Sequence, residues 1–470
     1  MTESVTQHTK TSFFTLLKQA LRGDVKDFTT GSIDRAIFLL AVPMVMEMVL
    51  ESSFALVDIY FVNMVSPAAA ATVGLTESSL TILYSLAWGL AMGATALIAR
   101  RAGEKDFKTA GSVAAQVILI ATAFSVLVSI FGILFPKEIL RFMGADASLV
   151  EEHYGFTQLM LGSNIVIMLL FVNNGIFRGA GDASIAMKAL IFSNIINIIL
   201  DPLLIMGYGP FPKMGLMGAA VATTIGRGCG VIYQFYHLFG GNDLVKLSIK
   251  QFKADMAMIR SLLSTSSGAM FQFLIGSCSW IFLAKLIAES GVEATSGYFT
   301  AIRICIFTIL PAWGIANAAA TLTGQNLGAG HPERAERSVW RSAFLTLCFF
   351  ALVGLLFFFF GETFMRFFTS NELAVKEGTR CLHVLAIGYI FFAYGMVLTQ
   401  AFNGAGDTKT PTYINLFIYW LFQIPLAYLL AKYLNMGSMG VYMAINIAET
   451  ALAIVSIIIF RKGKWKLVKV

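Results

Sequence analysis

Three acidic residues lie within one strongly apolar stretch near the start of the chain. Glu47, Glu51 and Asp58 fall inside residues 36–62, which have the length and composition of a membrane-spanning helix. At about 100° per residue, the step from Glu47 to Asp58 ends about 20° from whole turns, and Glu51 lies between them. A carboxylate within a membrane costs several kcal/mol, so this stripe is expected to face a polar cavity. Phe54 can add a cation–π contact there.

A second polar group occurs further along the chain. Asn197 and Asp201 are four residues apart and share one helical face. Pro202 follows and leaves the carbonyl of Ile198 without its helical partner. Carboxylate, amide and freed carbonyl oxygens are the hard ligands that suit an alkali cation such as Na⁺, and the same carboxylates can instead carry protons. Pro43, in the first acidic stretch, frees a carbonyl in the same way, so both prolines are predicted hinges.

A run of small residues follows this group. It reads Gly218-Ala-Ala-Val-Ala-Thr223-Thr224, and small side chains permit close helix packing in a membrane. The hydroxyl of Thr223 can supply a further oxygen ligand, or it can bond to its own helix backbone. The residues alone leave both roles open.

The composition requires many further spans to position these groups. The chain is 57% apolar and 13% charged, whereas about a quarter of the residues in a soluble protein are charged. We predict an all-α membrane protein with twelve transmembrane helices. The expected spans are residues 36–62, 75–99, 112–136, 156–177, 185–208, 214–237, 261–287, 295–322, 340–362, 381–403, 411–431 and 438–460.

The 34 Lys and Arg residues indicate an orientation. Most of them lie in the tails and in the loops on the same side as both termini, which places both ends in the cytoplasm of a protein of the inner (cytoplasmic) membrane. Residues 1–34 contain no cleavable apolar core, so the first span is expected to act as an uncleaved signal. Residues 11–22 are predicted to form an interfacial amphipathic helix or to belong to a disordered tail. The formal charge of +7 reflects this orientation, and nucleic acid is not an expected partner.

Two similar motifs indicate an internal duplication. Phe177-Arg-Gly-Ala-Gly-Asp182 follows the fourth predicted span, and Phe402-Asn-Gly-Ala-Gly-Asp407 follows the tenth, 225 residues later (402 − 177). Because each copy has an even number of spans, we predict parallel repeats around a central cleft, with substrate bound between them near mid-membrane. The expected organisation is a cytoplasmic tail (1–34), an N-lobe (35–240), a cytoplasmic linker (241–260), a C-lobe (261–460) and a basic cytoplasmic tail (461–470).

The second copy lacks most of the acids of the first. The equivalent positions hold Gln272 for Glu47, Leu283 for Asp58 and, by matching Pro202 with Pro425, Ile424 for Asp201. The cation chemistry is therefore predicted for the first half, with Gln272 as an accessory polar residue. Glu449, Lys285 and Arg303 do lie within the predicted spans of the second half. Two of them can pair as structural ions, or they can act in substrate binding or coupling, and both readings stay open.

Together these features resemble the multidrug and toxic compound extrusion (MATE) family over about residues 30–460. The resemblance rests on the two repeats, on Pro43 followed by Asp58, on the first Gly-Ala-Gly-Asp motif, and on Asn197 to Pro202 followed by the small-residue run. It implies antiport of Na⁺ or H⁺ against organic, often cationic or aromatic, compounds through a V-shaped cleft.

The resemblance also implies a set of site residues. Asp58, Asn197, Asp201 and Thr223 match the first-half cation site, as ligands of Na⁺ or carriers of H⁺, and the backbone of Ala219 is a neighbour. One branch of the family has an acidic pair in helices seven and ten, where this chain has Gln272 and Gln400. The pattern is therefore closer to the DinF-like or related prokaryotic branch. The resemblance does not assign Glu47 and Glu51, which we treat with Phe54 as residues that bind substrate or assist the site.

The sequence thus predicts a secondary active exporter of organic cations or neutral amphiphiles that works by alternating access. We expect no cofactor beyond the coupling ion, a monomeric protein, and small organic substrates and membrane lipids as partners. The alternative is a lipid-linked oligosaccharide flippase of the same superfamily, which needs basic residues for pyrophosphate, whereas the first half here is acidic. An enzyme is not expected, because the chain has no HExxH or GxSxG motif and its five cysteines are scattered singly.

Overall fold

The computed structural model describes residues 12–24, 27–240 and 244–469. Parts of the expected N-terminal tail (1–11 and 25–26), of the linker (241–243) and of the C-terminal tail (470) lie outside the described residues. Within the described part, the chain forms helices and no strand, so the prediction of an all-α protein is confirmed.

Twelve long spans run through the structure. Eleven of them are long and apolar enough, within the described residues, to cross a membrane, and the twelfth is α2, which carries the three acids. The spans are α2 (Ile33–Asn63), α3 (Pro67–Gly103), α4 (Phe107–Leu134), α6 (Ala147–Gly162) with α7 (Asn164–Ala180), α8 (Ala183–Met206), α9 (Leu216–Gly240), α10 (Met256–Ala288), α11 (Val292–Gly328), α12 (Pro332–Phe368), α13 (Glu372–Gly404), α14 (Lys409–Asn415) through η3 (Leu429–Tyr433), and α16 (Ser438–Arg461). The predicted twelve-span layout is confirmed.

Short elements join or cover the spans. They are α1 (Phe13–Arg22), α5 (Pro136–Phe142), and the 3₁₀ turns η1 (Ile249–Phe252) and η4 (Lys464–Leu467). Of the two alternatives for residues 11–22, the structure has the helix. The rings of Phe13 and Phe38 lie 5.7 Å apart, and the Lys188 ammonium donates to the carbonyl of Arg22 at 3.1 Å. These contacts fix α1 against α2 and α8.

Polar side chains begin several of the spans. The Ser66 hydroxyl accepts from the Ala69 N–H at 3.0 Å ahead of α3, and Asp106 accepts from the Thr109 N–H at 3.0 Å ahead of α4. Such caps satisfy backbone donors that have no partner within the first turn. The helix starts therefore follow from local sequence.

The two Gly-Ala-Gly-Asp motifs form the same turn. Gly181 has φ +90° and Gly406 has φ +88°, a left-handed conformation that glycine adopts without strain. The Asp182 N–H donates to the Phe177 carbonyl at 2.9 Å, and the Asp407 N–H donates to the Phe402 carbonyl at 2.9 Å. The two copies of the sequence motif therefore adopt the same backbone conformation.

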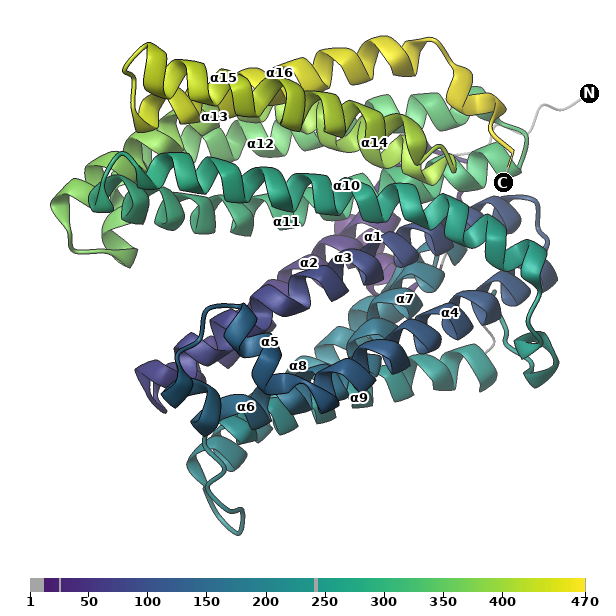
Figure 1. Ribbon diagram of the computed structural model, residues 1–470. Coiled ribbons are helices and arrows are strands. Elements are labelled where there is room, and N and C mark those ends of the chain that lie inside the picture. The colour runs from purple at the N-terminus through teal and green to yellow at the C-terminus, as the bar shows by residue number, and fades with distance from the viewer. Residues whose placement is uncertain (1–11, 25–26, 241–243, 470) are drawn as a thin grey trace, which may run out of the picture.

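The spans form two bundles that diverge. Figure 1 shows the N-lobe (α2 to α9) and the C-lobe (α10 to α16) converging at the side where the termini lie and separating toward the opposite side. The lobes touch through small residues: a Cβ on Gly89 would lie 2.6 Å from the Met270 nitrogen, and one on Gly314 would lie 2.6 Å from the Val45 nitrogen. Only glycine permits such close approach of two helices.

Polar contacts strengthen the closed side. The Arg341 guanidinium on α12 bonds to both oxygens of Asp34 on α2, at 2.6 and 3.1 Å. Arg334 donates to the backbone carbonyls of Gly31 and Thr30 at 2.8 and 2.9 Å. These bonds tie the start of the N-lobe to the C-lobe at the side of the termini.

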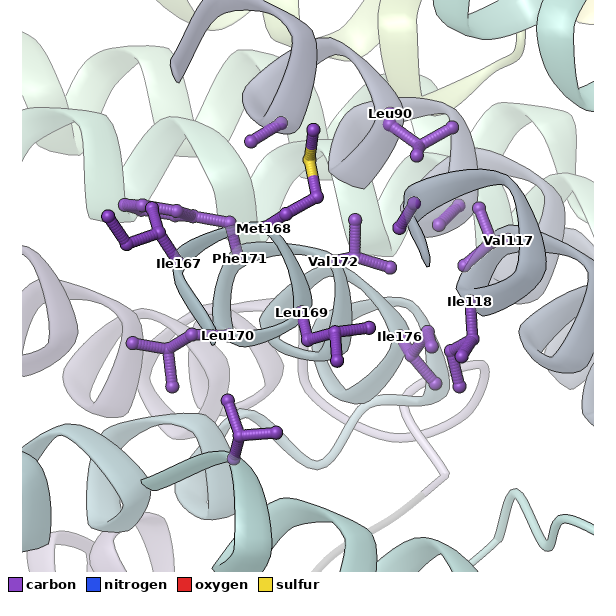
Figure 2. Close-up of a cluster of buried hydrophobic side chains, with 14 of the residues drawn as sticks. Leu90, Val117, Ile118, Ile167, Met168, Leu169, Leu170, Phe171, Val172 and Ile176 are labelled. Carbon is purple, nitrogen blue, oxygen red and sulfur yellow. The ribbon is translucent and has the colours of Figure 1, made fainter. Parts of the chain in front are cut away.

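Helix α7 forms the centre of the N-lobe. Most of its side chains are buried, as expected of a helix surrounded by other helices. Figure 2 shows its side chains pointing in several directions, with Leu90 of α3 and Val117 and Ile118 of α4 close by. Ile167, Met168 and Val172 of α7 are 0–2% exposed.

The eleventh span departs from a regular helix. It contains two π-helical segments, η2 (Leu416–Gln423) and η3 (Leu429–Tyr433), on either side of α15 (Ile424–Tyr428). Pro425 lies in α15 and cannot donate a backbone hydrogen bond, which disturbs the regular pattern around it. By contrast, α2 and α8 remain single helices through Pro43 and Pro202, the two predicted hinges.

Candidate functional site

Two oxygen-bearing pairs lie together inside the N-lobe. The Thr223 hydroxyl of α9 donates to the Asp58 carboxylate of α2 at 3.3 Å, and the Asn197 amide donates to the Asp201 carboxylate within α8 at 3.2 Å. The charges of Asp58 and Asp201 are close enough to act on each other. The four residues expected to bind a cation are therefore brought together, and we call them the oxygen cluster.

Close packing of α8 against α9 builds the oxygen cluster. A Cβ on Gly226 would lie 2.9 Å from the Ser193 carbonyl and 3.2 Å from the Cβ of Asn197. Glycine at this position thus lets α9 approach the polar face of α8. Gly218, the first residue of the small-residue run, makes a similar contact, because a Cβ there would lie 2.6 Å from the carbonyl carbon of Leu204 on α8.

The oxygen cluster contains atoms that have no partner. Asn197 and Asp201 are 0% exposed, and Asn197 Oδ1 and Asp201 Oδ2 accept no hydrogen bond. A buried acceptor without a partner costs about 1–3 kcal/mol. A proton on the carboxylate or a cation between the oxygens would remove this cost, and the donor set of carboxylate, amide and hydroxyl oxygen fits Na⁺. No group of three or more His, Cys, Asp or Glu suited to a metal is found among the described residues.

Ala219 lies on α9, one turn before Thr223. Its side chain is 1% exposed and belongs to the N-lobe core. Within an α-helix its carbonyl accepts from the N–H of Thr223, so it is already engaged. The structure therefore places Ala219 one helical turn from Thr223, as a neighbour of the oxygen cluster.

A buried cation lies next to the oxygen cluster. Arg227 of α9 is 5% exposed and donates to the Glu51 carboxylate at 2.8 Å. Its guanidinium carbon lies 4.4 Å from the ring centre of Phe54 and 5.9 Å from that of Phe171. Its Nε and Nη1 groups donate no hydrogen bond. Phe54 therefore stacks on the protein's own cation, and Glu51 forms an ion pair.

Glu77 is a further acid of this region that the sequence reasoning missed. It lies on α3, and its charge acts on those of Arg227, Asp58 and Glu51. The signal was available, because residue 77 falls within the predicted span 75–99. It belonged to the same class of intramembrane acid as the three residues of α2.

Glu47 is in a different place from the other two acids of its stripe. It is 1% exposed and accepts from Arg178, in the last turn of α7, at 3.0 Å. The Arg178 carbonyl accepts from Thr321 of the C-lobe at 3.2 Å. Glu47 is therefore locked in an ion pair at the contact between the lobes.

The C-lobe holds mostly neutral partners at the equivalent places. Gln272 and Asn403 exchange two hydrogen bonds, at 3.0 and 3.1 Å. Glu449 accepts from the Tyr419 hydroxyl at 3.2 Å. Lys285 and Arg303 are exposed, and neither is paired with Glu449 in the part of the chain that the structure describes.

A family model, MatE, matches the chain in two segments, residues 43–203 and 269–429. Each segment contains one copy of the repeated motif, and together they cover most of the chain. This chain belongs to the MatE family. Like other MatE proteins it is a multi-pass membrane transporter.

Several MatE relatives align with nearly the whole chain. The probable multidrug resistance protein NorM of Thermotoga maritima is 25% identical over 92% of this chain and 93% of its own length. An FAD transporter of Shewanella oneidensis is 23% identical over 90% of this chain and 94% of its own. A multidrug resistance MATE transporter solved in its outward-facing conformation has a TM-score of 0.86 and 26% identity, with 96% of this chain and 98% of that chain covered.

Proposed function

We propose that this MatE protein is a secondary active multidrug exporter that exchanges Na⁺ or H⁺ for organic cations or neutral amphiphiles. We further propose that it works as a monomer in the inner (cytoplasmic) membrane with both termini in the cytoplasm. The observation that carries the proposal is the oxygen cluster of Asp58, Asn197, Asp201 and Thr223, which has unpartnered buried oxygens within the membrane. The names of relatives such as NorM support the multidrug substrate.

The arrangement of the lobes supports export by alternating access. The lobes are in contact at the side of the termini and apart at the opposite side (Figure 1). If the termini are cytoplasmic, this is the state that releases substrate outward. Opening inward must then break the Arg341 bonds to Asp34 and the small-residue contacts. Free energy from ion binding in the N-lobe drives this change.

The charges around the oxygen cluster favour a cationic substrate. The acids Asp58, Glu77 and Asp201 outnumber Arg227, the base that acts on Asp58 and Glu77 and that is already paired with Glu51. Opposite charges about 4–8 Å apart attract by several kcal/mol at an effective dielectric constant near 20. An entering proton or Na⁺ neutralises the acids and weakens their hold on the organic cation. Coupling then follows from competition for the same carboxylates.

Efflux from proteoliposomes tests the proposal. The purified full-length protein is reconstituted, and outward transport of ethidium is measured under a Na⁺ gradient and, separately, under a pH gradient. Efflux under at least one gradient, and none without a gradient, is expected. Absence of efflux under both gradients would contradict antiport.

Binding measurements separate the substrate classes. Ethidium and an uncharged aromatic amphiphile are expected to bind more tightly than FAD, whose pyrophosphate is repelled by the acids. FAD serves as the anionic probe because one relative is an FAD transporter. Tighter binding of FAD would contradict the preference for cations, and tighter binding of a lipid-linked sugar pyrophosphate would favour the flippase alternative.

A further inference from the structure

Helices α9 and α16 are equivalent spans of the two lobes. The motif Met214-Gly-x-x-Gly218 recurs as Met436-Gly-x-x-Gly440, 222 residues later (436 − 214). In both lobes the N–H of the first residue of the motif donates to the end of the preceding span, at 2.8 and 3.1 Å. With this separation, Glu449 occupies the place that Arg227 has in the N-lobe. The chain therefore carries opposite charges at equivalent intramembrane positions.

Glu449 has one weak partner. Its Oε1 accepts from the Tyr419 hydroxyl at 3.2 Å, and its Oε2 is shielded and accepts nothing. Tyr419 lies in the π-helical segment η2, an irregularity that is frequent at functional sites. The residue as a whole is partly exposed.

No base neutralises Glu449 in the described part of the chain. Tyr419 is the titratable group that acts on its carboxyl. The charged residues of the elements packed against α16 lie toward helix ends, away from the middle of the span. They are Arg260 and Lys285 of α10, Glu372, Lys376, Glu377, Arg380 and His383 of α13, Lys409 of α14, and Lys432 of η3.

An ionised carboxylate in this setting is strongly unfavourable. Within a membrane, a charge whose only partner is a neutral hydroxyl costs several kcal/mol. A proton on Oε2 removes the charge and keeps the hydrogen bond from Tyr419 to Oε1. We propose that Glu449 is a proton-binding site of the C-lobe, separate from the oxygen cluster, that loads and releases one H⁺ during the transport cycle. Loading joins a proton from solvent to the carboxylate, and release returns that proton to solvent.

Infrared difference spectroscopy tests proton binding directly. Spectra of the full-length protein in lipid are recorded between acidic and alkaline pH for the wild type, Glu449→Gln and Glu293→Gln. Gln has the shape of the neutral acid, so it retains the bond with Tyr419, while Glu293 is an exposed acid at the start of α11. One component of the carbonyl band of buried protonated acids is expected in the wild type and in Glu293→Gln and is expected to be missing from Glu449→Gln, while the components of the N-lobe acids remain. Identical difference spectra in the wild type and Glu449→Gln would overturn the proposal.

Transport under a pH gradient tests whether the proton takes part in the cycle. This arm rests on the proposed function. Glu449→Gln is expected to lose about tenfold or more of its pH-driven ethidium efflux while it binds ethidium within about twofold of the wild type. Unchanged pH-driven efflux in Glu449→Gln would overturn the role in the cycle. If the wild type moves no ethidium under any gradient, the proposed function fails, and the infrared result still decides whether Glu449 binds a proton.

Discussion

The two lobes fill one structural position with different chemistry. In the N-lobe, Glu47 and Arg178 form a buried ion pair at 3.0 Å. In the C-lobe, Gln272 and Asn403, each 225 residues further on, exchange hydrogen bonds at 3.0 and 3.1 Å. The surrounding turns have the same backbone conformation. The structure at this position therefore requires two side chains that hydrogen-bond to each other, and these side chains need not be charged.

The same contrast extends to the middle of the membrane. The N-lobe gathers Glu51, Asp58, Glu77 and Asp201 around one buried base, Arg227. The C-lobe has Glu449 with a tyrosine. Since each buried charge has a cost, its retention in one lobe indicates a role in that lobe. The two lobes therefore share one scaffold but differ in their ion chemistry, most of which lies in the N-lobe.

The largest effect on stability is expected at Arg227. Arg227→Gln leaves Glu51 buried without its partner, and breaking such a pair costs about 3–5 kcal/mol. The double variant Arg227→Gln, Glu51→Gln removes both charges and is expected to recover most of the loss. Thermal and denaturant-induced unfolding of the solubilised protein measure both. If the single variant were as stable as the wild type, the buried ion pair would not be an energetic difference between the two lobes.

Copying the C-lobe pair into the N-lobe tests whether an amide pair can replace the ion pair. The double variant Glu47→Gln, Arg178→Asn gives the N-lobe the amide pair of the C-lobe, and we expect it to change the free energy of unfolding by about 1 kcal/mol or less. Glu47→Gln alone leaves Arg178 unpaired, and we expect it to lower the free energy of unfolding by clearly more than the double variant does. The same unfolding assay compares them. A double variant no better than the single one would show that the lobes differ in shape as well as in charge.

The ion pair across the closed side is expected to have a smaller effect. Asp34 and Arg341 are 58% and 47% exposed at their side chains, and an exposed pair contributes about 0.2–1 kcal/mol. Asp34→Asn is therefore expected to shift the balance between outward-open and inward-open states by about fivefold or less. Distances between spin labels on the two lobes measure this balance. A change to a wholly inward-open protein would mean that this pair alone holds the lobes together.

The smallest effect concerns pH and the C-terminal turn. Lys466 and Trp340 bond to Glu336 and lower the pKa of its carboxyl below the ordinary 4.5. Because the pKa of Glu336 is lower in the folded protein than in the unfolded protein, its ionised carboxylate stabilises the folded state. This stabilisation is complete above the ordinary pKa and is lost as the pH falls below it. Glu336→Gln should therefore lower the unfolding temperature slightly at pH 7, with no difference from the wild type in strong acid. A difference that grew as the pH fell would contradict this.

Much of the fold could be predicted from the sequence because its signals are long or repeated. The spans follow from apolar runs and the duplication from two copies of Gly-Ala-Gly-Asp. The π-helical turns around Pro425 were not predicted, because hydropathy does not distinguish a π-helix from an α-helix. The length of α3 beyond residues 75–99 was also missed, since its first turns are rich in alanine.

The site was predicted in part. The face shared by Asn197 and Asp201 follows from helical spacing within one span. The partners of Glu47 and Glu51 come from α7 and α9, and pairing between spans is set by packing that a single sequence does not specify. Arg227 falls within the predicted span 214–237 and is thus an intramembrane base by sequence, but its stacking on Phe54 required the structure. The roles of the oxygen cluster in coupling remain predictions.

Gradient-driven efflux by Asp201→Asn shows whether the oxygen cluster of the N-lobe couples transport to the ion. Wild-type protein and the variant are reconstituted in equal amounts, and ethidium efflux is followed under whichever gradient drives the wild type. Because Asn cannot carry the charge that a cation or proton neutralises, we predict that efflux falls about tenfold or more, with Glu293→Gln unaffected. Full gradient-driven efflux by Asp201→Asn would show that the N-lobe does not couple transport to the ion.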